Sequence, residues 1–219
     1  MDILRVTVLG GLLGLDGTAV GQFMVSRPVV AGALVGLVLG EPGLGLAIGA
    51  ILELYLVVAF PTGGARFPEG STATAVAVAS AAGFDSAGAV PLAIAVGLVW
   101  GQVSGLTITG LRHVNSRIAP EPGGARSRPG RIVGAHLLAI GLDFLRAAAL
   151  TASGIWIGRL TVGSLVESWP LGGPASNGLL LVGGAVSGGI LLRDLGGFRR
   201  RRVAFVAGLA IGIIGSRYL

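Results

Sequence analysis

Long apolar segments with very few charges recur along this chain, and they constrain its fold more than any other feature. Residues 87–111, 132–156 and 171–192 are each long enough for a membrane-spanning helix, which needs about 20 mostly apolar residues. Only 12% of all residues are charged and the mean hydropathy is +0.85, whereas soluble domains are about one quarter charged. The sequence therefore predicts an all-α, polytopic membrane protein with glycine-rich transmembrane helices.

Two further apolar segments, 29–40 and 44–60, predict broken helices. The first has about 12 residues, which is too short to cross a bilayer comfortably. Residues 41–43 between them read Glu-Pro-Gly, a typical turn composition. Glycine recurs at every fourth position, at Gly32, Gly36 and Gly40 in the first segment and at Gly45 and Gly49 in the second. Such stripes allow close helix packing in lipid, so we expect a tight re-entrant helical hairpin.

The other segments are arranged around this hairpin. Residues 3–25 form a first apolar segment without a clear cleavage site, so we expect it to remain in the protein and to end before Pro28. Residues 61–70 read as a polar, kinked connection, and residues 71–83 as a second short element dipping into the bilayer. A last short apolar element covers residues 203–214.

The basic residues are all arginine, and most of them fall in two clusters. These are Arg112, Arg117, Arg126, Arg128 and Arg131, followed later by Arg193 and Arg199 to Arg202. Short basic loops between apolar spans are typical of the cytoplasmic side, so the net charge of +6 indicates topology and not nucleic-acid binding. We expect an N-terminal membrane part (1–111), a basic cytoplasmic loop (112–131) and C-terminal membrane helices (132–219).

Ionisable residues inside the apolar segments are candidates for function, because each costs about 2.5–3.5 kcal/mol on insertion scales. They are Asp16, Arg27, Glu53, Asp143 and Arg146. The Glu53 carboxylate would accept hydrogen bonds from sugar hydroxyls or hold a proton; alternatively, it is a partner of Arg27 or Arg66 that only fixes the hairpin. Arg27 either donates to a polar substrate or extends to the interface from the end of its segment.

Asp143 and Arg146 are three positions apart on one helix face, which favours a structural ion pair. Gln22 and Gln102 are weaker candidates, because single amides also hold helices together. The predicted substrate-binding residues are thus Asp16, Gln22, Arg27 and Glu53.

No soluble-type chemistry is predicted. Cysteine is absent, and the two histidines, His113 and His136, lie far apart in the sequence without ligand spacing. Glycine is so abundant that a Gly-x-Gly match to a phosphate-binding loop carries no information. We therefore expect no catalytic residues, no cofactor and no metal, and a protein that is not itself an enzyme.

A series of motifs occurs in a fixed order along the first half of the chain. It reads SRPVVAG (26–32), LVGLVLGEP (34–42), the glycines at 45 and 49, LEL (52–54) and GGA with FPE (63–69), and DFLR follows at 143–146. In this order the chain resembles the membrane subunit, enzyme IIC, of the mannose/fructose/sorbose class of the bacterial phosphoenolpyruvate-dependent sugar phosphotransferase system. The resemblance is dense over residues 10–110 and thinner afterwards.

This resemblance implies a multi-pass, sugar-conducting permease subunit in the bacterial cytoplasmic (inner) membrane, working as part of an oligomer. It implies a sister membrane subunit, enzyme IID, and soluble IIA and IIB phosphocarrier proteins that phosphorylate the sugar as it emerges. Glu53 is the best sugar-contact candidate by the same resemblance, with Gln22 and Arg27 near it. The residues before Arg27 match only loosely, so the resemblance does not specify the sugar.

Two other interpretations stay open. The chain ends soon after its second basic cluster, which would suit a non-transporting regulatory or interaction membrane protein derived from the same fold. An unrelated small transporter or vitamin-uptake subunit is the third interpretation, and it requires the resemblance to be accidental.

Overall fold

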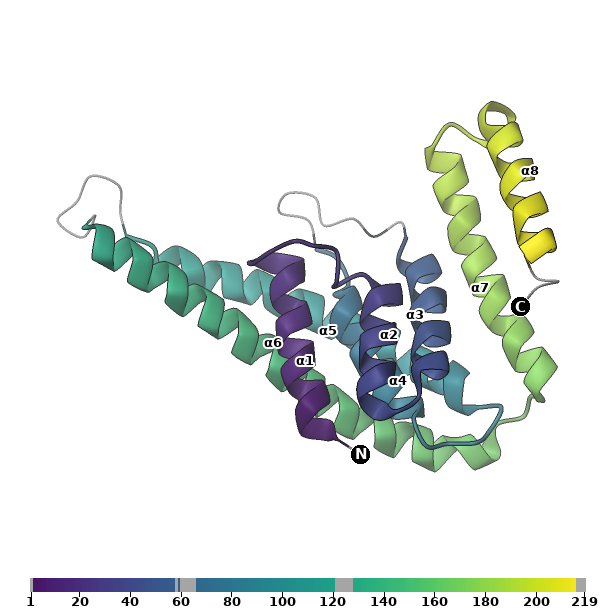
Figure 1. Cartoon of the computed structure of the whole chain (residues 1–219), viewed down its shortest axis with the longest axis horizontal. Helices are drawn as coiled ribbons and strands as arrows, with labels where there is room; N and C mark the ends of the chain where they lie inside the picture. The colour runs from purple at the N-terminus through teal and green to yellow at the C-terminus, as the bar shows by residue number, and fades with distance from the viewer. Residues whose placement is uncertain (1, 58, 60–65, 121–127, 216–219) are drawn as a thin grey trace.

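The computed structural model describes residues 2–57, 59, 66–120 and 128–215, and its regular elements within these ranges are helices. The first four are α1 (Ile3–Thr18), α2 (Pro28–Leu39), α3 (Pro42–Leu56) and α4 (Gly70–Ala81). They are followed by α5 (Ala89–Ile118), α6 (Pro129–Leu165), the 3-10 helix η1 (Val166–Ser168), α7 (Gly173–Asp194) and α8 (Phe198–Gly215). Figure 1 shows α1 to α4 gathered beside a long α5–α6 hairpin, with α7 and α8 as a pair at one side. The predicted all-α class is confirmed.

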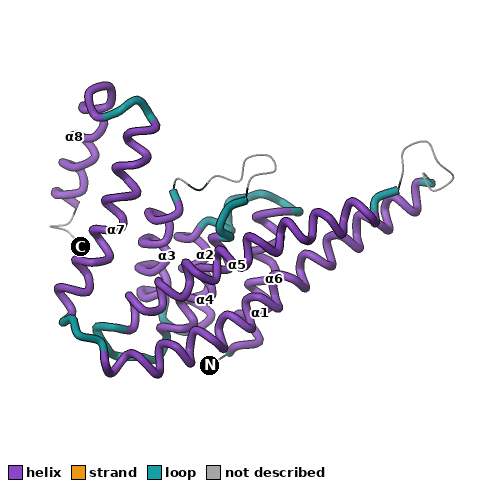
Figure 2. The backbone as a smooth tube through the Cα atoms, turned by 180° about the vertical axis from the view of Figure 1, so that it is seen from behind, coloured by secondary structure: helices purple, strands orange, loops and turns teal. Residues whose placement is uncertain are grey.

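Among the described residues, three helical stretches are long and apolar enough to cross a membrane: α5, α6 continued by η1, and α7. With 30 and 37 residues, α5 and α6 are about 45 and 55 Å long at 1.5 Å per residue. Both are therefore longer than the hydrocarbon layer is thick, which is about 30 Å. Figure 2 shows them running side by side to a common tip.

The predicted hairpin is confirmed in α2 and α3, which pack closely against each other. Gly40 ends α2 with a φ of 78°, a left-handed conformation that suits glycine, and Pro42 opens α3 at its first turn. The glycine stripes face each other, since a Cβ at Gly45 would lie 2.7 Å from the Gly36 Cα. At 12 and 15 residues, both helices are too short to cross the hydrocarbon layer alone.

The short helix α4 is the centre of the fold. It packs against α1, α2, α3, α5 and α6, and every residue from 71 to 81 is buried. Alanine, serine, threonine and valine fill it because neighbours surround it on all sides. The predicted second short element is therefore a buried core helix. The predicted connection before it falls partly on residues 60–65, which lie outside the described residues.

The first apolar segment is shorter than predicted. Instead of continuing to residue 25, α1 ends at Thr18, and an irregular connection covers residues 19–27. Gly21 has a φ of 90°, and Gln22 and Met24 also have positive φ values, which a helix does not allow. The chain thus leaves helical geometry well before the proline that was expected to break it.

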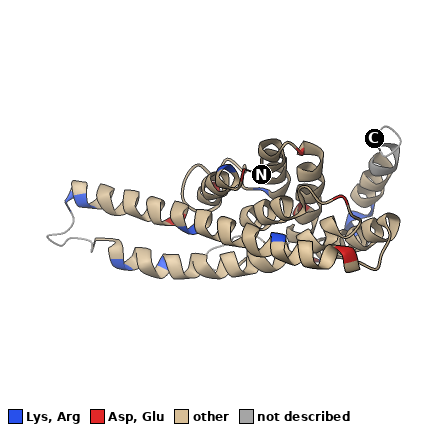
Figure 3. Cartoon of the chain, turned by 90° about the horizontal axis from the view of Figure 1, so that it is seen from below, with Lys and Arg blue, Asp and Glu red and all other residues tan. Residues whose placement is uncertain are grey.

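The predicted basic loops were also wrong in extent. Within the range 112–131, α5 continues to Ile118 and α6 begins at Pro129, so that Arg112 and Arg117 are helical. The second cluster, 199–202, lies in the first turns of α8. Arginine favours helices and carries its charge on a long side chain into water, so a basic segment need not be a loop. Figure 3 shows basic residues along the outer part of the α5–α6 hairpin.

The C-terminal pair is attached more loosely than the rest. α7 packs against α3, whereas α8 runs beside α7 with little contact. All side chains from 198 to 211 are exposed, including Val203, Val206 and Ile211. The division into 1–111 and 132–219 stays a prediction, although α1 packs along α6 across it.

Candidate functional site

The connection between α1 and α2 is held in place by one carboxylate. Asp16, in the last turn of α1, is only 5% exposed. Its Oδ1 accepts a hydrogen bond from the Phe23 backbone N–H at 2.6 Å, and its Oδ2 accepts one from the Ser26 N–H at 2.9 Å. These bonds hold the backbone in which Gln22 and Met24 have φ values of 53° and 66°. Non-glycine residues in this region cost of order 1 kcal/mol each, a kind of strain that is concentrated at functional sites.

The same connection delivers Arg27 to the hairpin. Arg27 is the N-cap residue of α2, and its guanidinium forms an ion pair with the Glu53 carboxylate on α3. The two side chains are 35% and 22% exposed, so the pair is only partly shielded from ligand or water. Of the two partners predicted for Glu53, Arg27 is the one observed, while Arg66 is exposed.

A second, more deeply buried charge network lies beside this pair. Arg146 on α6 donates to both carboxylate oxygens of Glu69, at 2.9 and 3.0 Å, and to Asp143 Oδ1 at 2.9 Å. The three side chains are only 3–10% exposed. The predicted pair of Asp143 and Arg146 is confirmed, but it is part of a larger group.

Hydroxyl groups complete this network. The Ser104 hydroxyl donates to Glu69, and the Thr18 hydroxyl donates to Asp143. Arg146 also donates to Thr107 Oγ1 at 3.1 Å. The network therefore links the end of α1 and the start of α4 to α5 and α6, and it fixes the short helices on the long hairpin.

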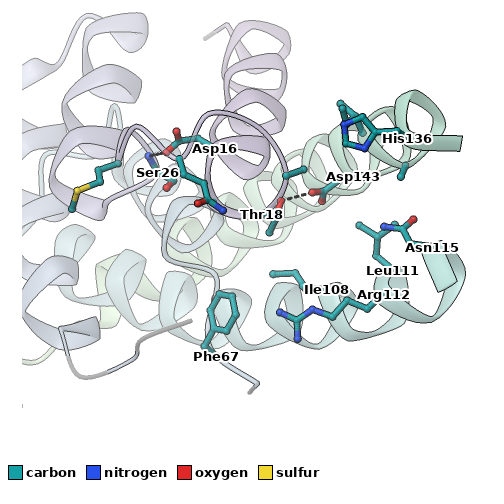
Figure 4. Close-up of a pocket in the computed structure, with 16 residues that line it drawn as sticks. Asp16, Thr18, Ser26, Phe67, Ile108, Leu111, Arg112, Asn115, His136 and Asp143 are labelled. Atoms are coloured by element: carbon teal, nitrogen blue, oxygen red, sulfur yellow. Dashed lines mark hydrogen bonds between the residues drawn. The ribbon is translucent and has the colours of Figure 1, made fainter. Parts of the chain in front are cut away.

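Two adjoining cavities open among these groups. The small cavity, of about 110 Å³, is lined by Arg27, Glu53, Glu69 and Ser71, with Phe67 and Pro68 from the segment before α4. The large cavity, of about 590 Å³, is lined by α1, the α1–α2 connection, α5 and α6, as Figure 4 shows. Gly17, Thr18, Ser26 and Phe67 line both, so the two cavities meet at the end of α1.

The four predicted binding residues gather around these cavities. Arg27 and Glu53 line the small one, and Asp16 and Gln22 line the large one. Gln102 lies elsewhere, on an exposed face of α5 that borders a separate cavity beside α7.

Sequence reasoning missed four further lining residues: Glu69, Arg112, Asn115 and His136. Glu69 was assigned to a polar connection, and its burial at 4% exposure has no local sequence signal. Arg112 was counted only as part of a basic loop. The described residues contain no group of three or more His, Asp and Glu side chains arranged to hold a metal ion.

Comparisons with known proteins agree on a family and on a fold. Residues 1–192 match the family described as "PTS system sorbose-specific iic component". A relative from Lacticaseibacillus casei, "PTS system sorbose-specific EIIC component", is 28% identical over 76 residues, which are 35% of this chain and 27% of the relative. The matched part thus spans about a quarter of that relative's length.

Two solved structures share the fold over 99% of this chain and 92% of their own. One, described as "Structure of membrane protein", has a TM-score of 0.69 at 20% identity. The other is described as "CryoEM Structure of Mannose Transporter ManYZ and Microcin E492 (MceA) complex" and has a TM-score of 0.56 at 21% identity.

Proposed function

Since this chain belongs to the family of sorbose-specific IIC components of the phosphotransferase system, we propose that it is the membrane subunit through which such a system takes up a hexose. The sugar binds in the small cavity and its junction with the large one. It is then phosphorylated by a IIB protein, which is recharged by a IIA protein. A IID subunit accompanies the chain in the bacterial cytoplasmic membrane.

The observation that carries this proposal is the position of the Arg27–Glu53 pair. The pair joins the N-terminus of one short helix to the last turn of another, beside an irregular connection and next to a cavity. Transporters commonly build substrate sites from such broken helices and from the polar groups that their ends expose. A carboxylate and a guanidinium side by side offer acceptors and donors for sugar hydroxyls.

Each predicted residue has a distinct role in this proposal. Glu53 accepts from sugar hydroxyls, and Arg27 orients that carboxylate and donates to a ring or hydroxyl oxygen. Asp16 acts indirectly, since its oxygens are occupied by the backbone of the connection. Gln22 borders the large cavity, where its amide contacts sugar that is entering or leaving.

The test is phosphoenolpyruvate-dependent uptake of labelled hexoses by cells that carry this chain with its proposed partners. Replacing Glu53→Gln removes a charged hydrogen-bond acceptor, and such bonds contribute about 1.5–3 kcal/mol, so uptake at low sugar concentration falls about tenfold or more. The matched control is Glu167→Gln, which changes an exposed carboxylate in η1 that lines neither cavity.

Membrane abundance and thermal stability of each variant separate the two interpretations of Glu53. Lost uptake with normal abundance and stability supports sugar contact. If the variant loses both stability and uptake, Glu53 has a purely structural role in the hairpin. No uptake of any hexose by the unmodified chain with its partners contradicts the transport proposal and favours the non-transporting alternative.

A further inference from the structure

The large cavity is lined by both acidic and basic side chains. Its inner end, where it meets the small cavity, is formed by Asp16, Thr18 and Asp143. The wall opposite these groups, here called the outer wall, carries Arg112 and Asn115 of α5 and His136 of α6. Figure 4 shows His136 and Asn115 on the side toward the ends of α5 and α6, and the Arg112 guanidinium reaching back toward Phe67. The outer wall lies on the side toward the basic tip of the α5–α6 hairpin.

The groups of the outer wall are free to bind a ligand. Arg112 forms no ion pair with any described residue, although it lines a cavity that also contains two carboxylates. The side-chain Oδ1 of Asn115 is buried and has no hydrogen-bond partner among the described residues. This wall thus holds hydrogen-bonding capacity that the described part of the protein does not use, and the buried Asn115 oxygen in particular needs an explanation.

At the inner end, by contrast, the carboxylates are already satisfied. Asp16 accepts from two backbone N–H groups, and Asp143 accepts from Arg146 and Thr18. The two carboxylates leave a negative electrostatic potential at this end of the cavity. A neutral sugar can bind there, but an anion is repelled.

We propose that the outer wall binds the sugar phosphate product: Arg112 and His136 donate to its phosphoryl oxygens, and Asn115 Oδ1 accepts from one of its sugar hydroxyls. This inference rests on the proposed function. Transfer from the carrier protein forms a P–O bond to a sugar hydroxyl, breaks the bond between phosphorus and the carrier, and releases the hydroxyl proton. The neutral sugar thereby becomes a phosphomonoester with a charge of about −1.5 to −2 at neutral pH.

The charged groups that line the cavity then act on the sugar phosphate in opposite ways. The carboxylate-lined inner end repels the new anion, while the Arg112 guanidinium attracts it with the planar donor geometry that suits phosphate oxygens. The volume of about 590 Å³ lies in the range of small-molecule sites, so the cavity accommodates a hexose phosphate. The product is thus held at the Arg112 wall, away from the carboxylates.

The experiment measures binding to the full chain in lipid nanodiscs by isothermal titration calorimetry at fixed ionic strength. The probes are mannose, mannose 6-phosphate, fructose, fructose 1-phosphate and inorganic phosphate. The variant is Arg112→Gln, and the matched control is Arg117→Gln, five residues further along α5 and outside the cavity lining. Both positions are exposed, so both variants are expected to fold.

We expect Arg112→Gln to weaken binding of a sugar phosphate about tenfold or more, as for loss of one charged hydrogen bond, and to leave the affinity for the free sugar unchanged. Arg117→Gln should leave both affinities unchanged. The inference is overturned if Arg112→Gln has no effect, if Arg117→Gln has the same effect, or if inorganic phosphate binds as tightly as the sugar phosphates. Failure of the unmodified chain to bind any free hexose instead contradicts the proposed function.

Discussion

Glu53 and Glu69 line the same small cavity, but their oxygens are used differently. Both oxygens of Glu69 are taken by Arg146 and Ser104, and its side chain is 5% exposed. Glu53 has one guanidinium partner, a weak contact at 3.4 Å from the Val29 N–H, and 22% exposure. A carboxylate with free lone pairs can exchange partners with a ligand, whereas one held by a bidentate guanidinium is fixed. From this contrast we infer that Glu53 contacts the ligand, whereas Glu69 supports the structure of the site.

The support role of the buried network leads to a prediction about Arg146. Removing one partner of a buried ion group leaves uncompensated charge, which costs about 3–5 kcal/mol. We therefore expect Arg146→Gln to lower the thermal unfolding temperature of the purified protein markedly, because Glu69 and Asp143 then lie buried without a cation. Arg131→Gln, which changes an exposed arginine on the same helix, is the control.

A compensating variant makes this prediction sharper. Adding Glu69→Gln and Asp143→Asn to Arg146→Gln removes every charge of the network, so much of the lost stability should return. Equal unfolding temperatures for Arg146→Gln and Arg131→Gln would show that the network does not stabilise the fold.

At the scale of elements, the α2–α3 hairpin depends on glycine at the contact between its two helices. An added Cβ at Gly45 would lie 2.7 Å from the Gly36 Cα, which is closer than real Cβ atoms approach, whereas one at Gly43 would meet nothing within 4 Å. Both glycines belong to α3, so they form a matched pair.

We expect Gly45→Ala to separate α2 from α3, reducing folded protein in the membrane and moving Glu53 relative to Arg27. Gly43→Ala should be neutral or slightly stabilising, by up to about 0.5–1 kcal/mol, because alanine favours a helix over glycine. Membrane abundance and unfolding temperature measure both effects. Equal behaviour of the two variants would count against glycine-mediated packing in the hairpin.

The sequence predicted this hairpin because its determinants are local. Glycine spacing, a Glu-Pro-Gly turn and segment length all lie within residues 29–60. The end of α1 was predicted wrongly, because Asp16 binds the backbone 7 and 10 residues later, which no periodicity reveals.

The candidate site was predictable only in part for the same reason. Ionisable residues in apolar segments pointed to Arg27, Glu53 and the pair of Asp143 and Arg146. Glu69 was missed because its partner Arg146 lies 77 positions away, and only the packing of α4 between α1, α5 and α6 brings them together. Arg112 was taken for a loop residue because charge patterning does not show where a helix ends.

Across the whole molecule, the two arginine clusters lie on the same side, although single arginines such as Arg5 and Arg159 lie elsewhere. The outer ends of α5 and α6 lie in the upper half of Figure 1 on the left, and the α7–α8 connection lies in its upper half on the right. These parts carry the described residues of the two arginine clusters. The α2–α3 turn, the segment between α4 and α5, and η1 lie at the opposite end, with the acidic residues Glu41, Asp85 and Glu167. Since arginine marks the cytoplasmic side of membrane proteins, the upper end is expected to face the cytoplasm.

Because the chain contains no cysteine, this orientation can be tested with variants that each carry one introduced cysteine. Ala87 and Ala119 are both exposed and flank α5, about 45 Å apart at 1.5 Å per residue. We expect a membrane-impermeant maleimide to label Ala87→Cys in intact cells or spheroplasts, and Ala119→Cys only after the membrane is permeabilised. The reverse pattern would put the Arg112 end of the large cavity outside the cell. A phosphorylated product could not then leave by that end into the cytoplasm, so this labelling also decides whether sugar phosphate held at the Arg112 wall can leave inward.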